Sequence, residues 1–306
     1  MRPREARPFL KWAGGKTQLL SELRRFYPAE FNGYLEPFVG SGAVFLDLYN
    51  QGRLSHRRVR LMDGNADLIG CYRAVRDSAE EVIRHLEGLA AGHRRDGTPH
   101  YYAVRDARFN PRRRRLVTSG ATPDVRYPAA LAAMLIYLNR TGYNGLFRLN
   151  AKGGFNVPAG RYANPRICDA DNLRLVARAL AAPRTRIDWR RFDTVTRLAR
   201  PGDFIYFDPP YAPLSQTARF TGYTAGGFTA ADQERLQRVA ITLARRGCRV
   251  LQSNSSAPSI LELYGDSAAA REAGLRIHTI HARRAINSRA SSRGHVEELL
   301  ITNIEA

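Results

Sequence analysis

The sequence predicts an α/β fold: a mostly parallel, doubly wound sheet of seven strands that carries an inserted, mainly helical domain. Two observations predict it. Short apolar stretches of strand character recur from the first part of the chain to its end, with helical patterns between several of them. From about residue 70 to 163 the sequence pattern changes to long helical stretches and then a glycine-rich stretch. A length of 306 residues is enough for one large or two modest domains.

Seven stretches are expected as strands because apolar, β-branched and aromatic residues dominate them and turn-forming residues bound them. They are residues 34–38, 59–62, 185–189, 204–207, 248–253, 275–281 and 296–302. Residues 228–246 have apolar side chains spaced three or four apart, which is typical of an amphipathic helix between two strands. The last two strands are expected to form a C-terminal hairpin.

The inserted region is expected to begin with helices at 68–90 and 128–139, separated by a basic polar loop at 93–126. A β-hairpin at about 141–162 follows, because glycines punctuate that stretch. The arginine run at 112–115 is as consistent with a solvated loop as with phosphate contacts.

The most informative motif is the tetrapeptide Asp208-Pro209-Pro210-Tyr211, which follows a run of four apolar residues. A strand that ends there presents its side chains where open α/β sheets bind ligands. An exocyclic amine of a nucleobase is a poor nucleophile, because its lone pair is delocalised into the ring. Asp208 and the Pro209 carbonyl offer acceptors for both N–H bonds, and two prolines fix their geometry. Tyr211 offers a flat surface for an unstacked base, so the motif indicates methylation of a nucleobase amine.

A glycine pair and an acid indicate the methyl donor. Gly40 and Gly42 lie between an expected strand and a helical stretch, where glycine lets the backbone approach a ligand closely. Phe45 replaces the third glycine of the dinucleotide fingerprint, which disfavours a pyrophosphate and favours S-adenosylmethionine. The next strand ends at Asp63, in the place of an acid that bonds ribose hydroxyls.

Lysine is rare in this chain. Of 48 basic residues only Lys11, Lys16 and Lys152 are lysines, and two of these lie between residues 11 and 17. A phosphate-binding P-loop is excluded there, because Leu10 occupies the position of its first glycine. Where arginine is so strongly favoured over lysine, a remaining lysine indicates a position at which arginine cannot replace it. We therefore expect this segment to be functional.

Composition indicates a polyanionic partner. A net charge of +20 and a pI near 10.7 predict DNA binding that weakens steeply with salt. No apolar run approaches 18 residues and no secretory signal is evident, so no membrane partner and a cytoplasmic location are expected. Cys71, Cys168 and Cys248 are isolated, have no zinc spacing and are expected as buried apolar residues. None follows a proline, which disfavours cytosine C5 methylation, and no metal site is expected.

Four blocks of the chain resemble the DNA adenine N6-methyltransferase (Dam) family, in its D12 class with the alpha motif order. They are residues 9–16, 36–42, 138–162 and 206–220, and the string at 138–150 is the most specific. The resemblance implies a Rossmann-like class I methyltransferase fold, S-adenosylmethionine as cofactor and double-stranded DNA as partner. It also implies a catalytic domain formed by 1–69 and 164–306 and a target-recognition domain at 70–163.

The resemblance further implies site residues. The catalytic face would be Asp208, Pro209, Pro210 and Tyr211. The cofactor would be bound by Trp12, Lys16, Phe38, Gly40, Gly42, Asp63 and Asp208. DNA would be contacted by Lys11, Tyr143, Asn144, Leu146, Arg148, Pro158 and Tyr162. Arg148 matches an arginine that reads guanine, and the match around it suggests the site GATC.

Several alternatives remain at this point. Cytosine N4 methylation uses similar chemistry but lacks the match at 138–162. Methylation of glutamine amides or RNA amines usually goes with asparagine at the position of Asp208. A DNA-binding regulator that has lost catalysis is a third alternative, although every expected catalytic residue is present. A monomer is expected, associated with the nucleoid of a bacterium or phage, either solitary or paired with a restriction endonuclease.

Overall fold

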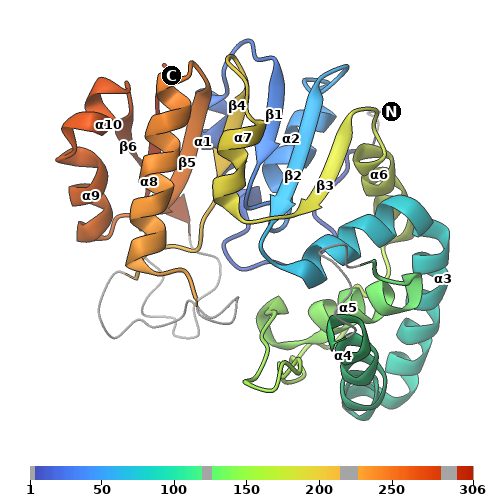
Figure 1. Cartoon of the computed structure of the whole chain (residues 1–306). Helices are drawn as coiled ribbons and strands as arrows, with labels where there is room; N and C mark the ends of the chain where they lie inside the picture. Colours follow the sequence, from blue (N-terminus) through green and yellow to red (C-terminus); the bar gives the residue numbers. More distant parts are fainter. Residues whose placement is uncertain (1–3, 119–125, 214–226, 284–294, 306) are drawn as a thin grey trace.

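A seven-stranded sheet forms the centre of the molecule within the residues that the computed structural model describes, 4–118, 126–213, 227–283 and 295–305 (Figure 1). The strand order is β3-β2-β1-β4-β5-β7-β6, parallel through β5, with β7 antiparallel to both β5 and β6. The strands are β1 (Gly33–Glu36), β2 (Arg58–Asp63), β3 (Thr185–Trp189), β4 (Phe204–Phe207), β5 (Arg249–Ser255), β6 (Arg276–Arg283) and β7 (His295–Thr302). The expected α/β class and mostly parallel sheet are confirmed.

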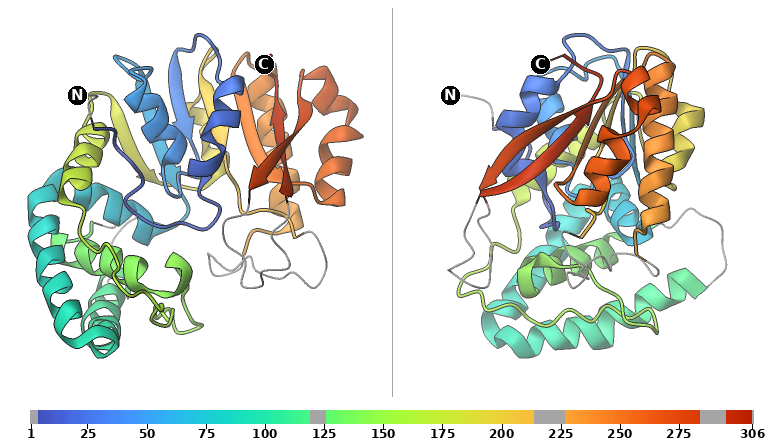
Figure 2. Two further views of the ribbon diagram at one scale, coloured as in Figure 1. Left: turned by 180° about the vertical axis from the view of Figure 1, so that it is seen from behind. Right: turned by 90° about the vertical axis from the view of Figure 1, so that its left-hand side faces the viewer.

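Helices cover both faces of the sheet (Figure 2). One face carries α1 (Leu20–Leu23), α2 (Ala43–Asn50) and α6 (Ala170–Leu180), and the other carries α7 (Val195–Leu198) and α8 (Ala230–Arg245). Two further helices, α9 (Pro258–Gly265) and α10 (Ala268–Glu272), precede β6. Successive residues of β4 are buried in different cores, Phe204 in one and Ile205 in the other. Burial on both faces explains why this strand is apolar throughout.

The inserted region is more helical than the sequence indicates. It holds α3 (Ala66–Tyr102), a π-helical stretch at Ala103–Phe109, α4 (Asn110–Thr118) and α5 (Ala129–Thr141). The expectation of a polar loop at 93–126 is therefore wrong for residues 93–118, and 119–125 lie outside the described residues. Tyr101, Val104 and Phe109 form a buried helical face between exposed polar residues. The division of the chain into two domains stays a prediction.

Residues 141–162, the hairpin segment, reverse direction beyond α5. Antiparallel bridges join Gly142 to Ala159 and Leu149 to Phe155, as isolated pairs rather than continuous strands. At the tip, Asn150 Oδ1 accepts hydrogen bonds from two backbone N–H groups, at 2.9 and 3.1 Å. In Figure 1 this segment and α3 to α5 lie beyond the carboxyl ends of the parallel strands.

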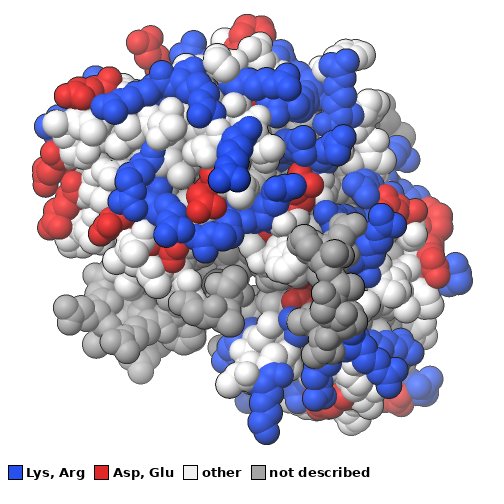
Figure 3. All heavy atoms as spheres, in the orientation of Figure 1, with Lys and Arg blue, Asp and Glu red and all other residues white. Residues whose placement is uncertain are grey.

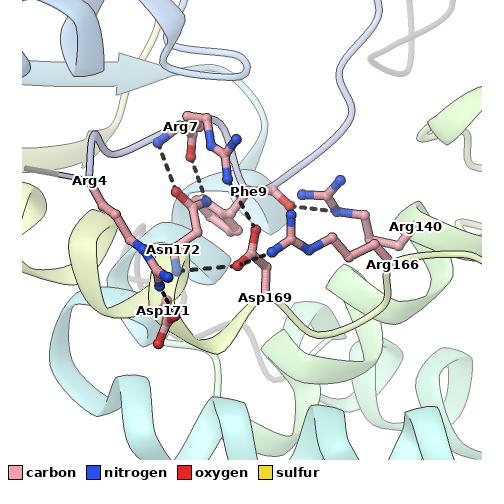
Figure 4. A network of polar contacts seen from close by, with 8 residues as sticks. All are labelled: Arg4, Arg7, Phe9, Arg140, Arg166, Asp169, Asp171 and Asn172. Atoms are coloured by element: carbon pink, nitrogen blue, oxygen red, sulfur yellow. Dashed lines mark hydrogen bonds and ion pairs between the residues drawn. The ribbon is translucent and has the colours of Figure 1, made fainter. Parts of the chain in front are cut away.

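The N-terminal segment, residues 4–16, is fastened by side chains from three helices. Asn172 of α6 both donates to and accepts from the backbone of Arg7, at 2.9 Å each way (Figure 4). Arg140 of α5 donates to the Phe9 carbonyl at 3.0 Å. Asn50 of α2 and Asn139 of α5 make the same two-way contact with Ala6 and Lys11. The segment thereby joins α2 and α6, which lie against the sheet, to α5.

Candidate functional site

Three carboxylates lie at neighbouring carboxyl ends of the parallel sheet. Glu36 ends β1, Asp63 ends β2 and Asp208 follows β4, and β1 pairs with both of the other strands. Glu36 is 2% exposed and accepts a hydrogen bond from Tyr34 Oη at 2.8 Å. Burial raises the pKa of the Glu36 carboxyl well above its usual range, and the nearby Asp208 raises it further. Glu36 was missed as a site residue; its signal was a carboxylate ending an apolar strand.

Asp208 forms an ion pair with Lys16 of the N-terminal segment. Lys16 Nζ lies 2.8 Å from Asp208 Oδ1, and the two side chains are 3% and 20% exposed. Burial raises the pKa of Asp208 to about 6, while the charge and hydrogen bond of Lys16 lower it. Asp208 Oδ2 has no hydrogen-bond partner among the described residues. The Lys16 ion pair thus engages only one of the two carboxylate oxygens.

A polar chain from α8 and β5 holds the tetrapeptide loop. Gln233 Nε2 donates to the Pro210 carbonyl at 3.1 Å, and Asn254 Nδ2 donates to Gln233 Oε1 at 3.0 Å. Asn254 Oδ1 accepts from the backbone N–H of Ala212 at 3.4 Å. In contrast, the Pro209 carbonyl accepts no hydrogen bond from any residue that the structure describes. The loop is fixed on one side and leaves an acceptor beside Asp208.

Tyr211, the last residue of the motif, is held by the antiparallel strand β7. Its hydroxyl donates to Glu298 Oε2 at 2.6 Å. The Lys16 ammonium lies 4.7 Å from the centroid of the Tyr211 ring, within cation–π distance. Sequence reasoning missed Glu298 and Gln233, because their contacts with the motif join distant parts of the chain. Residues 214–226, which follow the motif, lie outside the described residues.

The glycine turn between β1 and α2 lies next to Asp63. Gly40 and Gly42 have φ of 46° and 68°, a region that favours glycine. The Gly40 N–H donates to Asp63 Oδ2 at 3.1 Å, and a Cβ on Gly40 would lie 3.0 Å from the Trp12 ring. Burial raises the pKa of Asp63 to about 6, and backbone hydrogen bonds lower it in part. The turn, the acid and the tryptophan ring therefore form one group.

Aromatic rings flank this group. Trp12 stacks on Phe147 with ring centroids 6.1 Å apart, and Phe38 stacks on Phe192 at 5.2 Å. Trp12 and Phe38 are both half-buried. The structure thus brings all of the expected cofactor residues to the carboxyl ends of β1, β2 and β4.

Lys11 connects the N-terminal segment to the hairpin segment. Asn139 accepts from the Lys11 N–H and donates to the Lys11 carbonyl, at 2.7 Å each, and also donates to the Gly145 carbonyl at 2.8 Å. Gly145 has a φ of 63°, and a Cβ there would lie 2.3 Å from Lys11 Cβ. The Lys11 ammonium lies 3.9 Å from the centroid of the Tyr162 ring. Asn139 was not expected as a site residue.

The other expected DNA residues lie on the hairpin segment around a buried apolar anchor. Tyr143, Asn144, Arg148 and Pro158 are exposed and Leu146 is half-buried, whereas Phe147, Phe155 and Val157 are buried. The Tyr143 N–H donates to the Pro158 carbonyl at 2.9 Å, which brings these two residues together. Arg148 Nε donates to Asn156 Oδ1 at 2.8 Å, so the guanidinium is oriented across the segment.

Arg113 differs from the expectation for the arginine run. It is buried, and its guanidinium bonds both oxygens of Asp67 at 2.6 and 2.8 Å. It also donates to the Gly153 carbonyl near the hairpin tip, and Tyr127 donates to Asp67. The expectation that the arginine run at 112–115 lies in solvent or on phosphate is therefore wrong for Arg113. Its guanidinium instead compensates the buried carboxylate of Asp67 at the start of α3.

The three cysteines agree with the expectation of burial only in part. Cys71 and Cys248 are buried, and Cys168 is half-buried. Within the described ranges no three His, Cys, Asp or Glu side chains are grouped so as to hold a metal ion, and no helix is long and apolar enough to cross a membrane.

Comparisons with known proteins agree with this geometry. The family model described as D12 class N6 adenine-specific DNA methyltransferase matches residues 12–286. The chain is 38% identical to the Type II methyltransferase M1.LlaDCHI of Lactococcus lactis subsp. cremoris, over 97% of this chain and 95% of the relative. It is 37% identical to the Type II methyltransferase M.MjaIII of Methanocaldococcus jannaschii, over 98% and 99%. It is 35% identical to the DNA adenine methylase of Escherichia coli K12, over 96% and 94%.

Proposed function

Since the chain belongs to the D12 class N6 adenine-specific DNA methyltransferase family, we propose that it methylates N6 of an adenine flipped out of duplex DNA, with direct transfer and no covalent enzyme intermediate. Membership of this methyltransferase family implies S-adenosylmethionine as the donor. One observation carries the mechanism. Asp208 Oδ1 is paired with Lys16, whereas Asp208 Oδ2 and the neighbouring Pro209 carbonyl accept no hydrogen bond from any described residue.

The cofactor residues that we propose fit S-adenosylmethionine. Three carboxylates and one lysine converge there, which suits a donor with a cationic sulfonium and no phosphate. Asp63 would bond the ribose hydroxyls, and the glycine turn would let the backbone approach. Trp12 and Phe38 would flank the nucleoside. The remaining contacts would come from Lys16, Gly40, Gly42 and Asp208. When bound, the donor supplies an electrophilic methyl group.

The catalytic residues would act mainly by orientation. Asp208 Oδ2 and the Pro209 carbonyl would accept hydrogen bonds from the two N–H groups of the adenine amine, which would draw its lone pair out of the ring. Pro210 fixes the loop, and its carbonyl is held by Gln233. Tyr211, fastened by Glu298, would support the flipped base. The amine loses one proton as it gains the methyl group, and a carboxylate with a pKa of about 6 suits that proton.

The DNA-binding residues would come from the N-terminal and hairpin segments. We propose that Arg148, oriented by Asn156, reads a guanine through its two major-groove acceptors. The other contacts would come from Lys11, Tyr143, Asn144, Leu146, Pro158 and Tyr162. GATC is the proposed site. Two relatives are named Type II methyltransferases. We therefore propose two alternative roles for this protein: it methylates DNA alongside a partner restriction endonuclease, or it methylates DNA without one. A monomeric state and a nucleoid-associated, cytoplasmic location stay predictions.

The carboxylate is tested by Asp208→Ala and Asp208→Asn. Both variants are expected to lose methyl transfer while duplex binding stays within about twofold, because the DNA contacts lie on other segments. Mass spectrometry of the digested product identifies the nucleoside, and N4-methylcytosine in place of N6-methyladenine would favour the cytosine alternative. Unchanged methylation by Asp208→Ala would remove the carboxylate from the mechanism.

A further inference from the structure

An arginine-lined groove lies on the sheet face that carries α7, near the amino ends of β2 and β3. A cavity of about 640 Å³ there is lined by Arg58, Arg60, Arg184, Arg186, Arg200 and Asp203, among others. We call these five arginines the arginine groove. No helix covers this face of β2 and β3 in Figure 1, and Figure 3 shows basic side chains gathered over it. Asp208 lies at the opposite, carboxyl end of the sheet.

Three of the five arginines have no acidic partner among the described residues. Arg58 pairs with Asp203 at 2.6 Å and Arg60 pairs with Asp188 at 3.0 Å. Arg184, Arg186 and Arg200 are exposed, and no described carboxylate lies within ion-pair distance of them. A second cavity, of about 410 Å³, shares Arg186 and extends the basic surface toward α3. The groove therefore has a local excess of positive charge.

The arrangement is unfavourable for folding by itself. Arg60 and Arg186 are direct partners in the ladder between β2 and β3, and neighbouring strands lie only about 4.8 Å apart. Like charges placed opposite one another destabilise a sheet. Arg60 Nε is in addition buried and has no acceptor among the described residues. On α8, by contrast, Arg238 and Arg245 each have a glutamate partner. An anion from outside the chain would relieve the repulsion in the groove.

We propose that the arginine groove binds the phosphate backbone of a second segment of duplex DNA. The inference goes beyond the proposed function and shares only its DNA substrate. Charge complementarity selects the occupant, since duplex DNA carries about one negative charge per 1.7 Å of axis. The exposed Arg184 and Arg186 stand on either side of Thr185 at the start of β3, and residues at such alternate positions lie about 6.6 Å apart, so the two contact successive phosphates. The groove lies at the amino ends of the strands and Asp208 at the carboxyl ends, so we assign the groove to a DNA segment other than the one at Asp208.

The test uses the full chain with Arg184→Gln, Arg186→Gln and Arg200→Gln combined. Glutamine keeps much of the side-chain stem and removes the charge. The matched control, Arg238→Gln, Arg245→Gln and Arg271→Gln, removes the same charge from exposed positions on α8 and α10. Thermal unfolding checks that both variants fold. Two duplexes with different fluorophores, one with a methylation site and one without, report whether a single protein holds both.

We expect the wild type and the control to bring the two duplexes together, and the groove variant to bind the second duplex at least about tenfold more weakly. The salt slope of that binding is expected to fall by about 0.9 for each phosphate that the variant no longer neutralises. Methylation of a short single-site duplex should stay within about twofold, which separates a failure here from a failure of the proposed function. Equal weakening in both variants, no joining of duplexes by the wild type, or equal competition by single-stranded RNA would overturn the proposal.

Discussion

Lys16 Nζ lies 2.8 Å from Asp208 Oδ1, so the buried lysine of the N-terminal segment neutralises the acid that begins the tetrapeptide. The pair links the two parts of the proposed site. Lys16 follows the stretch that holds Lys11, which we propose contacts DNA, and Asp208 begins the motif that ends at Tyr211. A buried ion pair of this kind needs both partners, because the removal of one leaves the other charge uncompensated.

The pH dependence of methylation should report this pair. Burial raises the pKa of Asp208 to about 6, and Lys16 lowers it. If ionised Asp208 is the acceptor, the single-turnover rate rises with pH through an apparent pKa near 6. In Lys16→Gln the lowering influence is gone, so the rise should move to higher pH. Lys16→Arg keeps the charge and should move it less. A midpoint unchanged in Lys16→Gln would contradict the role of the pair.

Arg113 should be a large contributor to stability. Arg113→Met removes the cation from buried Asp67 and the donor from the Gly153 carbonyl, and should lower the free energy of unfolding by about 3–5 kcal/mol. Combining it with Asp67→Asn should restore part of that stability, since no buried charge then remains unpaired. Denaturant unfolding measures both, with the exposed Arg112→Met as control. A decrease below about 1 kcal/mol for Arg113→Met would show that its ion pair is dispensable.

Asn139 should couple the N-terminal segment to the hairpin segment. Asn139→Ala leaves the Lys11 backbone and the Gly145 carbonyl without their partner. It should weaken both stability, by about 1–3 kcal/mol, and specific DNA binding. The matched control is Asn172→Ala, which breaks the same two-way contact at Arg7, away from the hairpin segment. Fluorescence titration with a cognate duplex compares them, and equal DNA affinities for the two variants would reduce Asn139 to a structural role.

Arg148 should determine one base of the recognition site. Arg148→Ala should relax discrimination at a single guanine by about 1–3 kcal/mol, because alanine cannot make the bidentate hydrogen bonds of arginine to that base. Asn156→Ala should act in the same direction and less strongly, since Asn156 Oδ1 orients the guanidinium. Lys152→Ala at the exposed tip serves as control. Methylation of duplexes substituted at each position measures the preference, and an unaltered pattern in Arg148→Ala would refute the reading role.

The sheet was predictable because each strand is a contiguous stretch of local sequence. Strands 185–189 and 204–207 match their expected bounds, and the others differ only at their ends. The helical structure at 93–118 was hidden, because its buried face is diluted by arginines and depends on partners such as Asp67 from elsewhere. The tetrapeptide is contacted by Lys16, Gln233 and Glu298 from distant segments of the chain. No local sequence pattern predicts such contacts.

The most direct measurement is modified-base sequencing of DNA from a host that expresses the wild-type chain or Asp208→Ala at equal levels. The wild type should leave N6-methyladenine at one short recurrent sequence, and the Asp208→Ala host should show none above background. Methylated cytosine in place of adenine, or the same methyladenine pattern from the variant, would contradict the assignment of Asp208 as the acceptor for the adenine amine.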